Sequence, residues 1–465
     1  MPYTSSPTFT CSTPSPTATT VPAQSDKTFA NVSPRNGAII NKVAELDAGD
    51  VDAAVAAARR AFDDGTWRKL HYRQKKKILF KFADLMERDA EQLALLESLD
   101  VGKPIKDALA VDIPGSIKTL RYYAEALDKV YGEVGPETTD RISFAVHEPL
   151  GVIGVIVPWN FPLLMAMWKV GPALAMGNSI VLKPAEQSPL TALKMGELAL
   201  EAGLPPGVLN IVPGFGATAG KALALHMDVD MIAFTGSGPV GKLLMQYSGQ
   251  SNLKRVSLEL GGKSPQIVFA DCPDMNAAAV SAAWGVFFNQ GEVCTAASRL
   301  LVQEAIADEF TDKLLKVAKK IVPGDPLNPT TTFGSMVSEE QMKTALRYIG
   351  TATSEGNTLR LGGNRAREDS GGFYVEPTVF DAVQPTHTLA KEEVFGPVLA
   401  VTRFKTPEEA IRIANGTIYG LAAGLWTRDV SLAHRAARDL KAGLVWVNGW
   451  DACDITMPFG GFKQS

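Results

Sequence analysis

Between residues 151 and 248 the sequence alternates β-branched runs with helix-forming segments, and this alternation restricts the fold more than any other feature. The run 151–157 is apolar throughout, as in a parallel strand that is buried on both faces. Strands and helices that alternate at this spacing form βαβ units, so the segment predicts an α/β fold with a doubly wound parallel sheet. Further strands are predicted over 179–182, 208–212 and 231–234, and helices over 163–175, 190–202, 216–225 and 240–248.

A second series of strands and helices follows Gly262, which predicts two Rossmann-like halves. Upstream, helical spacing of apolar residues predicts helices over 51–62, 73–99 and 121–130, and 144–150 reads as a strand that leaves the main body. The second series has predicted strands at 266–269, 299–302, 375–383, 399–404 and 443–447, and helices at 277–288, 306–320, 407–414 and 432–440.

Length and composition exclude several classes of protein. A chain of 465 residues is expected to form two or three domains. A net charge of -4 favours neither nucleic acid nor an anionic membrane as partner, and no apolar run reaches the roughly 18 residues of a membrane-spanning helix. The four cysteines and five histidines form no metal-ligand pattern, so no metal is predicted, and a reducing, cytoplasmic setting is expected.

Residues 1–26 are rich in Ser, Thr and Pro, which predicts a disordered leader. A transit peptide is the alternative, because the segment is poor in acidic residues. However, no arginine precedes Arg35 and no apolar core is present, which favours a disordered or artificial leader.

A glycine-rich turn follows the predicted strand 231–234 and opens a helix, with the sequence Gly236-Ser237-Gly238-Pro239-Val240-Gly241. This is the context in which G-x-G-x-x-G binds a dinucleotide, because the first amides of a helix can bind pyrophosphate. A tight turn between packed elements is the other interpretation, and the cluster around Gly216 is a competing site. The acidic residue expected about twenty positions later would be Glu259.

Cys294 and Glu259 are the residues that carry chemistry in this sequence. A thiol nucleophile and a carboxylate base are the two groups needed to form and then hydrolyse a thioester. The apolar, glycine-rich segment 258–262 is expected to raise the pKa of Glu259 toward neutrality. A buried cysteine is more often a small apolar residue, and that inert role is predicted for Cys11, Cys272 and Cys453.

Together with Pro158-Trp159-Asn160-Phe161-Pro162, these residues resemble the aldehyde dehydrogenase superfamily from about Phe29 to the last residue. The resemblance implies NAD(P)-dependent oxidation of an aldehyde to its acid through a thiohemiacetal and a thioester on Cys294. It implies that Glu259 is the base and that the Asn160 amide, with the Cys294 backbone N–H, stabilises the oxyanion. Lys169 matches a family lysine near the base.

The resemblance also implies the cofactor site. Lys183 and Glu186 would bind the adenosine ribose, which frees Glu259 for chemistry, and Ser237 would contact phosphate. Glu393 and Phe395 would position the nicotinamide ribose and ring. A carboxylate at 186 repels a 2′-phosphate, so NAD is expected, with NADP as the alternative. The remaining predicted cofactor contacts are Ile156, Pro158, Trp159, Gly216, Gly236, Val240 and Leu260.

The family's substrate tunnel maps onto a mostly apolar set that suits an extended aliphatic or aromatic aldehyde. Segments 111–115 and 450–455 further resemble bacterial γ-glutamyl-γ-aminobutyraldehyde and guanidinobutyraldehyde dehydrogenases of polyamine catabolism. Asp112 is therefore predicted to contact an amine or guanidinium tail, as are Asp451 and Asp454. Each acid is equally plausible as a helix-face or turn carboxylate. The predicted tunnel residues are Phe161, Met165, Trp168, Val293, Thr295 and Phe459.

The resemblance divides the chain into an NAD-binding domain (27–128 and 151–261), an oligomerisation segment (129–150) and a catalytic domain (262–465). A homodimer or homotetramer is expected. Family members continue past the position of Ser465 with a strand that pairs in the oligomer, and this sequence lacks it. Two alternatives stay open: an inactive binding or structural member of the family, and a CoA-acylating relative. Such relatives usually lack the glutamate found here at 259.

Overall fold

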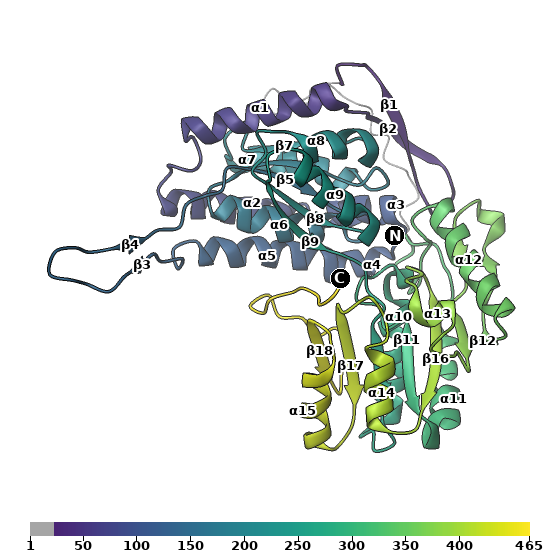
Figure 1. Cartoon of the computed structure of the whole chain (residues 1–465). Helices are drawn as coiled ribbons and strands as arrows, with labels where there is room; N and C mark the ends of the chain where they lie inside the picture. The colour runs from purple at the N-terminus through teal and green to yellow at the C-terminus, as the bar shows by residue number, and fades with distance from the viewer. Residues whose placement is uncertain (1–22) are drawn as a thin grey trace.

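A computed structural model describes residues 23–465 of the chain (Figure 1). Most of the predicted leader, 1–22, lies outside these residues. The expectation of disorder is wrong for 23–26. Ala23 is buried, and the backbone N–H of Gln24 donates to Asp50 Oδ1 at 2.9 Å. This hydrogen bond fastens the segment to the first helix, α1 (Ala48–Asp64).

The predicted α/β fold is confirmed, and its first sheet has five parallel strands in the order β7-β6-β5-β8-β9. The chain builds outward from β5 to one edge and then crosses to the other side of β5, so the strand order reverses between β5 and β8. The carboxyl ends of strands at such a point form a ligand-binding crevice. The strands are β5 (Val152–Ile156), β6 (Ser179–Lys183), β7 (Leu209–Ile211), β8 (Met231–Thr235) and β9 (Arg255–Glu259). The connecting helices are α6 (Pro162–Ala175), α7 (Leu190–Ala202), η2 (Gly216–Gly220), α8 (Lys221–Leu225) and α9 (Gly238–Gln250).

The second sheet has seven strands in the order β12-β15-β16-β11-β10-β17-β18, and all except β12 are parallel to their neighbours. It forms the core of the lower lobe in Figure 1. Its strands are β10 (Pro265–Val268), β11 (Arg299–Gln303), β12 (Thr358–Leu361), β15 (Thr378–Asp381), β16 (Val398–Phe404), β17 (Ala422–Trp426) and β18 (Leu444–Val447). Its helices are α10 (Met275–Phe287), η3 (Phe288–Gly291), η4 (Glu304–Ile306), α11 (Ala307–Ala318), α12 (Glu339–Ser354), η5 (Glu368–Ser370), α13 (Thr388–Lys391), α14 (Pro407–Ala414) and α15 (Val430–Asp439).

Helices from the N-terminal part of the chain cover the first sheet. The single helix predicted over 73–99 is two helices, because Asp89 leaves the helical conformation between them and its carboxylate pairs with Arg88 and Lys194. A π-helical turn, η1 (Ala108–Asp112), precedes α5, which packs against α6. The helices are α2 (Tyr72–Arg88), α3 (Ala90–Val101), α4 (Ile105–Asp107) and α5 (Ile113–Ala126).

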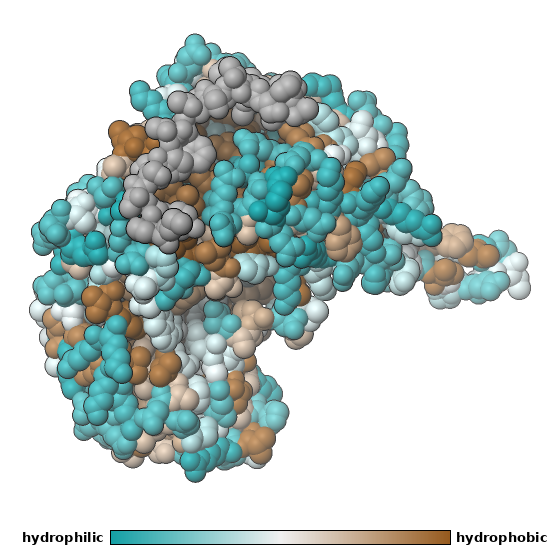
Figure 2. Space-filling model, turned by 180° about the vertical axis from the view of Figure 1, so that it is seen from behind, coloured by the Kyte–Doolittle hydropathy of each residue, from teal (hydrophilic) through white to brown (hydrophobic). Residues whose placement is uncertain are grey.

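A narrow arm, residues 129–150, projects from the upper lobe (Figures 1 and 2). Its strands β3 (Glu133–Val134) and β4 (Phe144–Ala145) pair antiparallel, so the strand predicted over 144–150 is much shorter than expected. The arm exposes apolar side chains, including Phe144 at 71% and Val146 at 73%. A two-stranded ribbon has no core of its own, and its outer edges lack partners within 23–465.

Two small hairpins complete the fold, and the sequence pattern predicted neither. β1 (Thr28–Val32) pairs with β2 (Ile39–Ala44), and β13 (Arg365–Ala366) pairs with β14 (Tyr374–Val375). The first hairpin runs from α1 toward α12 and so connects the two lobes (Figure 1). Within the described part of the chain, no helix has the length and apolarity needed to cross a membrane.

Candidate functional site

Several of the predicted dinucleotide residues lie at the carboxyl ends of the strands of the first sheet. Lys183 ends β6, and its ammonium pairs with Glu186 Oε2 at 2.8 Å. Lys183 is buried, and desolvation lowers its pKa. Ile156 ends β5, with Pro158 just beyond it. These side chains therefore lie beside the point where the strand order reverses.

The glycine-rich turn follows β8, as expected, and Ser237 is the residue that caps α9. The Ser237 side chain is exposed and makes no capping hydrogen bond, so the first N–H groups of this helix remain available to an anion. No heavy atom outside the turn lies within 4 Å of a Cβ built at Gly238 or at Gly216, so the approach to both is open. Val240 is exposed on the same helix, and Leu260 packs on Gly241 beneath it.

At the other end of the crevice, residues from both lobes meet. The Trp159 and Phe395 rings lie edge to face, with centroids 5.2 Å apart. Glu393 Oε1 accepts a hydrogen bond from the Gly262 backbone at 2.8 Å, and burial raises the Glu393 pKa to about 7. A Cβ at Gly261 would collide with the Glu393 carboxylate, so a side chain there would displace that carboxylate.

Cys294 follows a backbone turn that few sequences tolerate. Asn289 (φ 46°), Gln290 (φ 58°) and Gly291 (φ 76°) are three consecutive residues in the left-handed region. The thiol is half-buried, and desolvation raises its pKa to about 12, with the carboxylates of Glu393, Asp451 and Glu259 adding to the effect. In this structure the thiol is therefore protonated near neutral pH.

Asn160 is hydrogen-bonded to the segment that bears Cys294. Asn160 Nδ2 donates to the Glu292 backbone carbonyl at 2.9 Å, and the Asn160 backbone carbonyl accepts from Asn289 Nδ2 at 3.2 Å. A side-chain amide has a second N–H to offer. One hydrogen bond therefore positions the Asn160 side-chain amide relative to the Cys294 segment, and the other positions the Asn160 backbone.

Glu259 ends β9 and is half-buried, and its Oε2 has no hydrogen-bond partner within the described residues. Desolvation raises its pKa to about 7, as the apolar setting predicted, while the Lys169 charge opposes the rise. Lys169 Nζ donates to Thr235 Oγ1 at 2.6 Å, and Thr235 lies opposite Glu259 in the sheet register. Burial lowers the Lys169 pKa to about 8. The charges of Cys294, Glu259 and Lys169 are thus close enough to shift one another's pKa values.

The predicted tunnel wall is largely assembled. Trp168 and Phe459 rings pack with centroids 4.8 Å apart, and Phe161 stacks on Phe288 at 6.3 Å. Met165 and Thr295 are buried, and Val293 is half-buried. Asp451 is close enough to Cys294 for its charge to raise the thiol pKa, and desolvation raises the pKa of Asp451 itself to about 6.

The prediction that Asp112 contacts the substrate tail is wrong. Its side chain is fully buried and forms an ion pair with the buried ammonium of Lys103. A substrate amine has no route to this carboxylate. Asp454 is also unsuited, because it is fully exposed and accepts hydrogen bonds from Thr456.

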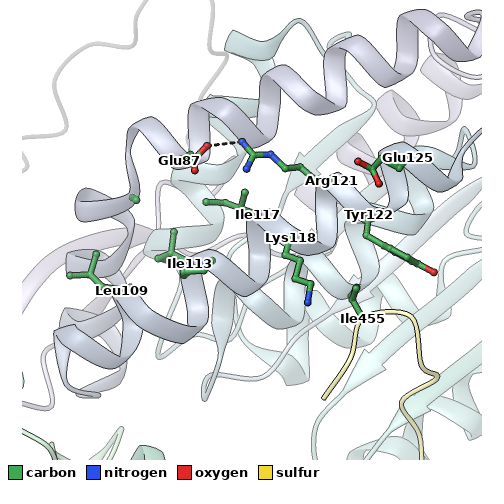
Figure 3. A pocket seen from close by; sticks show the side chains of 11 residues that line it. Glu87, Leu109, Ile113, Ile117, Lys118, Arg121, Tyr122, Glu125 and Ile455 are labelled. Carbon is green, nitrogen blue, oxygen red and sulfur yellow. Dashed lines mark hydrogen bonds and ion pairs between the residues drawn. The ribbon is translucent and has the colours of Figure 1, made fainter. Parts of the chain in front are cut away.

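A separate hollow of about 480 Å³ lies on the outer face of α5 (Figure 3). Its rim carries Lys118 and the Arg121–Glu87 ion pair, with 2.6 Å between charged atoms. It contains none of the predicted catalytic or cofactor residues, and Ile455 connects it with the 450–455 segment. Within residues 23–465, no group of His, Cys, Asp or Glu side chains is arranged to bind a metal ion.

Sequence reasoning missed Lys103 and Glu292, which lie directly behind the site. Lys103 Nζ is 4.0 Å from the centroid of the Phe161 ring. Glu292 is fully buried and accepts a hydrogen bond from the Val337 backbone at 3.1 Å. A charged residue two positions before the reactive cysteine was an available signal for Glu292. No local pattern marks Lys103.

Comparison with known proteins gives a consistent result. The model of the aldehyde dehydrogenase family matches residues 20–465. The NADP/NAD-dependent aldehyde dehydrogenase PuuC of Escherichia coli K12 is 51% identical over 443 residues, which are 95% of this chain and 89% of that protein.

Two solved structures are similar over 96% of this chain and 90% of their own. An indole-3-acetaldehyde dehydrogenase of P. syringae, in complex with NAD+ and IAA, has a TM-score of 0.95 at 54% identity. A gamma-glutamyl-gamma-aminobutyraldehyde dehydrogenase of Burkholderia cenocepacia has a TM-score of 0.94 at 54% identity.

The burial of the Lys103–Asp112 pair generates a stability prediction. Lys103→Met leaves a buried, uncompensated carboxylate, so we expect a loss of about 3–5 kcal/mol in the free energy of unfolding. The double variant Lys103→Met/Asp112→Leu removes both charges and should recover most of that loss. Urea unfolding checks this.

Lys129→Met is the matched control, since Lys129 pairs with Asp128 at the surface and its loss should leave the free energy of unfolding nearly unchanged. A double variant as unstable as Lys103→Met would contradict the prediction.

Proposed function

Because this chain belongs to the aldehyde dehydrogenase family, its reaction is the NAD(P)-dependent oxidation of an aldehyde, and we propose that Cys294, Glu259 and Asn160 carry it out. The observation that supports this assignment is their convergence. A thiol, a carboxyl with pKa about 7 and an amide bonded to the thiol's own loop meet where the two lobes join.

In the first step Cys294 attacks the aldehyde carbonyl, which gives a thiohemiacetal. The thiolate is the attacking species, so the raised thiol pKa requires a proton acceptor. Glu259 is suited to that task, because its carboxylate fraction grows as pH rises through about 7. The Asn160 amide then donates to the developing oxyanion, an interaction whose loss typically costs about 10²–10³ in rate.

When bound, a nicotinamide dinucleotide supplies the acceptor for the hydride that leaves the thiohemiacetal carbon, so that a thioester remains on Cys294. Glu259 next takes a proton from the water that hydrolyses this thioester. Lys169 has a supporting role, because its ammonium favours the ionised form of Glu259. A CoA-acylating enzyme transfers the acyl group to CoA and needs no base to activate water. The presence of Glu259 therefore favours hydrolysis of the thioester over transfer to CoA.

The cofactor assignment uses the remaining residues at the crevice. We assign the pyrophosphate to the start of α9 at Ser237, because its N–H groups are uncapped. We assign the adenosine ribose to Lys183 and Glu186, and the nicotinamide end to Glu393 with Phe395. A carboxylate at 186 favours NAD over NADP by repelling a 2′-phosphate. The other proposed contacts are Ile156, Pro158, Trp159, Gly216, Gly236, Val240 and Leu260.

For the substrate we propose an aliphatic aldehyde with an ω-amino group. Trp168, Phe161 and Phe459 supply an apolar wall for the chain. Among the candidate acids, Asp451 is the one whose side chain is open to solvent and whose charge acts on the Cys294 thiol. Similarity to a gamma-glutamyl-gamma-aminobutyraldehyde dehydrogenase supports a place in polyamine catabolism.

We also propose that the chain assembles into a homodimer or homotetramer through the arm, 129–150. The arm exposes a row of apolar side chains that a monomer has no reason to present. A cytoplasmic, reducing setting is proposed because the chemistry needs Cys294 as a free thiol.

The division of labour between Cys294 and Glu259 can be tested with propanal. Glu259→Gln should form no more than one equivalent of NADH per site, more slowly than the wild type because the thiol lacks its proton acceptor. It should then stall, with turnover lowered by about 10²–10⁴, because thioester hydrolysis lacks its base. Cys294→Ala should form none. Stopped-flow absorbance without CoA measures both.

Cys272→Ala, a buried thiol elsewhere in the chain, serves as the control and should turn over normally. Wild-type turnover should rise with pH through about 7 as the Glu259 carboxylate forms. Steady turnover by Glu259→Gln would contradict the assignment.

The substrate proposal is tested with γ-aminobutyraldehyde and butyraldehyde. Asp451→Asn should raise KM for the amino aldehyde by about tenfold or more, the worth of a hydrogen bond to a charged group, and leave butyraldehyde unchanged. Asp454→Asn is the matched control, since Asp454 lies on the surface. If both variants discriminate between the aldehydes as the wild type does, Asp451 does not bind the amine.

The arm proposal predicts that Phe144→Glu weakens self-association, because the charge would be buried in an apolar interface. Sedimentation velocity over a concentration series measures this. Val322→Glu, at an exposed apolar residue outside the arm, is the control and should sediment as the wild type does. Equal sedimentation of all three proteins would rule the arm out.

A further inference from the structure

Glu292 connects the proposed oxyanion residue to the proposed nucleophile through its backbone. The Glu292 carbonyl accepts from Asn160 Nδ2 at 2.9 Å and from Asn289 Nδ2 at 3.3 Å. Cys294 lies two residues later in the chain. The distance between the Asn160 amide and the thiol therefore depends on where the backbone of residue 292 lies.

The turn that leads to Glu292 has a strained backbone conformation. Asn289 and Gln290 both adopt the left-handed region, which is strained for residues other than glycine. Gly291 must be glycine, since a Cβ there would collide with the Gly396 carbonyl. Such a turn persists only if surrounding contacts fix it.

The Glu292 side chain supplies one of these contacts. Its Oε1 accepts from the Val337 backbone N–H at 3.1 Å, which ties the turn to the segment before α12. That segment is itself bonded to the other lobe, because Ser335 N–H donates to the Gly102 carbonyl at 3.0 Å. Glu292 is 0% exposed, and its Oε2 has no partner within residues 23–465.

Charge balance around this carboxyl is unusual. Glu97, Asp112 and Glu292 are all fully buried, and Lys103 is the ammonium among them. Lys103 pairs with Asp112. A buried carboxylate without its own partner is strongly disfavoured, so the two glutamates are stable only with protons bound.

We propose that Glu292 is a positioning residue that works as an uncharged carboxylic acid: its hydrogen bond with Val337 fixes the turn that sets the Asn160 amide against Cys294. This inference rests on the proposed roles of Cys294 and Asn160. Desolvation raises the Glu292 pKa well above its usual value, and the one charge that opposes the rise is Lys103. The same burial, together with Asp112, raises the Glu97 pKa.

Two substitutions separate the parts of this proposal. Glu292→Gln is neutral and keeps an acceptor for Val337 N–H, so kcat for propanal should stay within about threefold, comparable with one neutral hydrogen bond. Its pH–rate profile should match that of the wild type. Glu292→Met fills the same space without an acceptor. We expect its kcat to fall about a hundredfold or more with KM little changed, because misplaced groups raise the barrier and not the substrate affinity.

Asp381→Asn is the matched control: Asp381 is a buried carboxylate bonded to Arg360 and Arg403, far from the turn in the chain. It should lower the thermal midpoint yet leave kcat within about threefold, because the Asp381 carboxylate bonds to Arg360, Arg403 and Ala382 and not to the turn. If Glu292→Met does not fold, Glu292→Gln still tests the charge state. Loss of activity in Glu292→Gln, a shifted pH profile, or full activity in folded Glu292→Met would each overturn the proposal.

A readout without turnover keeps this test distinct from the proposed function. The difference infrared spectrum between wild type and Glu292→Gln at neutral pH should show the C=O stretch of a protonated carboxyl group. If the difference spectrum instead shows the bands of an ionised carboxylate for Glu292, the inference is overturned. A wild-type protein that shows the protonated band but oxidises no aldehyde would contradict the proposed function and leave the charge state established.

Discussion

The hydrogen bond from Asn160 Nδ2 to the Glu292 carbonyl is the interaction on which the candidate site depends. Asn160 belongs to the turn after β5, in the lobe built on the five-stranded sheet. Glu292 belongs to the turn after α10, in the lobe built on the seven-stranded sheet. Each lobe carries one of the two residues proposed for the chemistry, because Glu259 ends a strand of the first sheet and Cys294 follows a helix of the second. Under the proposed roles, the contact between the lobes aligns these two residues and also contributes to packing.

Crowding of carboxyl groups sets the electrostatics of this junction. Glu259 and Glu393 have pKa values near 7 and Asp451 near 6, in each case mainly through desolvation. All three carboxyl groups raise the pKa of Cys294. Lys169 is the cation that interacts with Glu259 and Cys294. A neutral thiol in this setting is stable and unreactive. A positive charge brought to the crevice by a ligand would lower the thiol pKa, which couples reactivity to occupancy of the site.

The elements best predicted from sequence are those whose pattern reflects a large buried core. The predicted strand 151–157 corresponds to β5 (Val152–Ile156), and helices were predicted at the bounds found for α7 and α14. Predictions failed where tertiary contacts decide. The helix over 73–99 breaks at Asp89, whose carboxylate pairs with Lys194, a residue distant in the chain that no local pattern reveals. For the site, sequence motifs identified Cys294, Glu259 and Asn160, but the bonds of Glu292 run to segments distant in the chain.

Asp112 and Asp451 show why residue type alone does not determine a role. Both are aspartates in segments that resemble the same group of dehydrogenases. Asp112 ends a π-helical turn that points its carboxylate inward, where Lys103 neutralises it. Asp451 lies in a segment without regular structure, with φ of 57°, and solvent reaches its side chain. A buried ion pair contributes little net stability compared with an apolar pair of the same size. Stability alone therefore does not account for Lys103 and Asp112, and the Lys103 ammonium also contacts the ring of Phe161, which neighbours Asn160 in the chain.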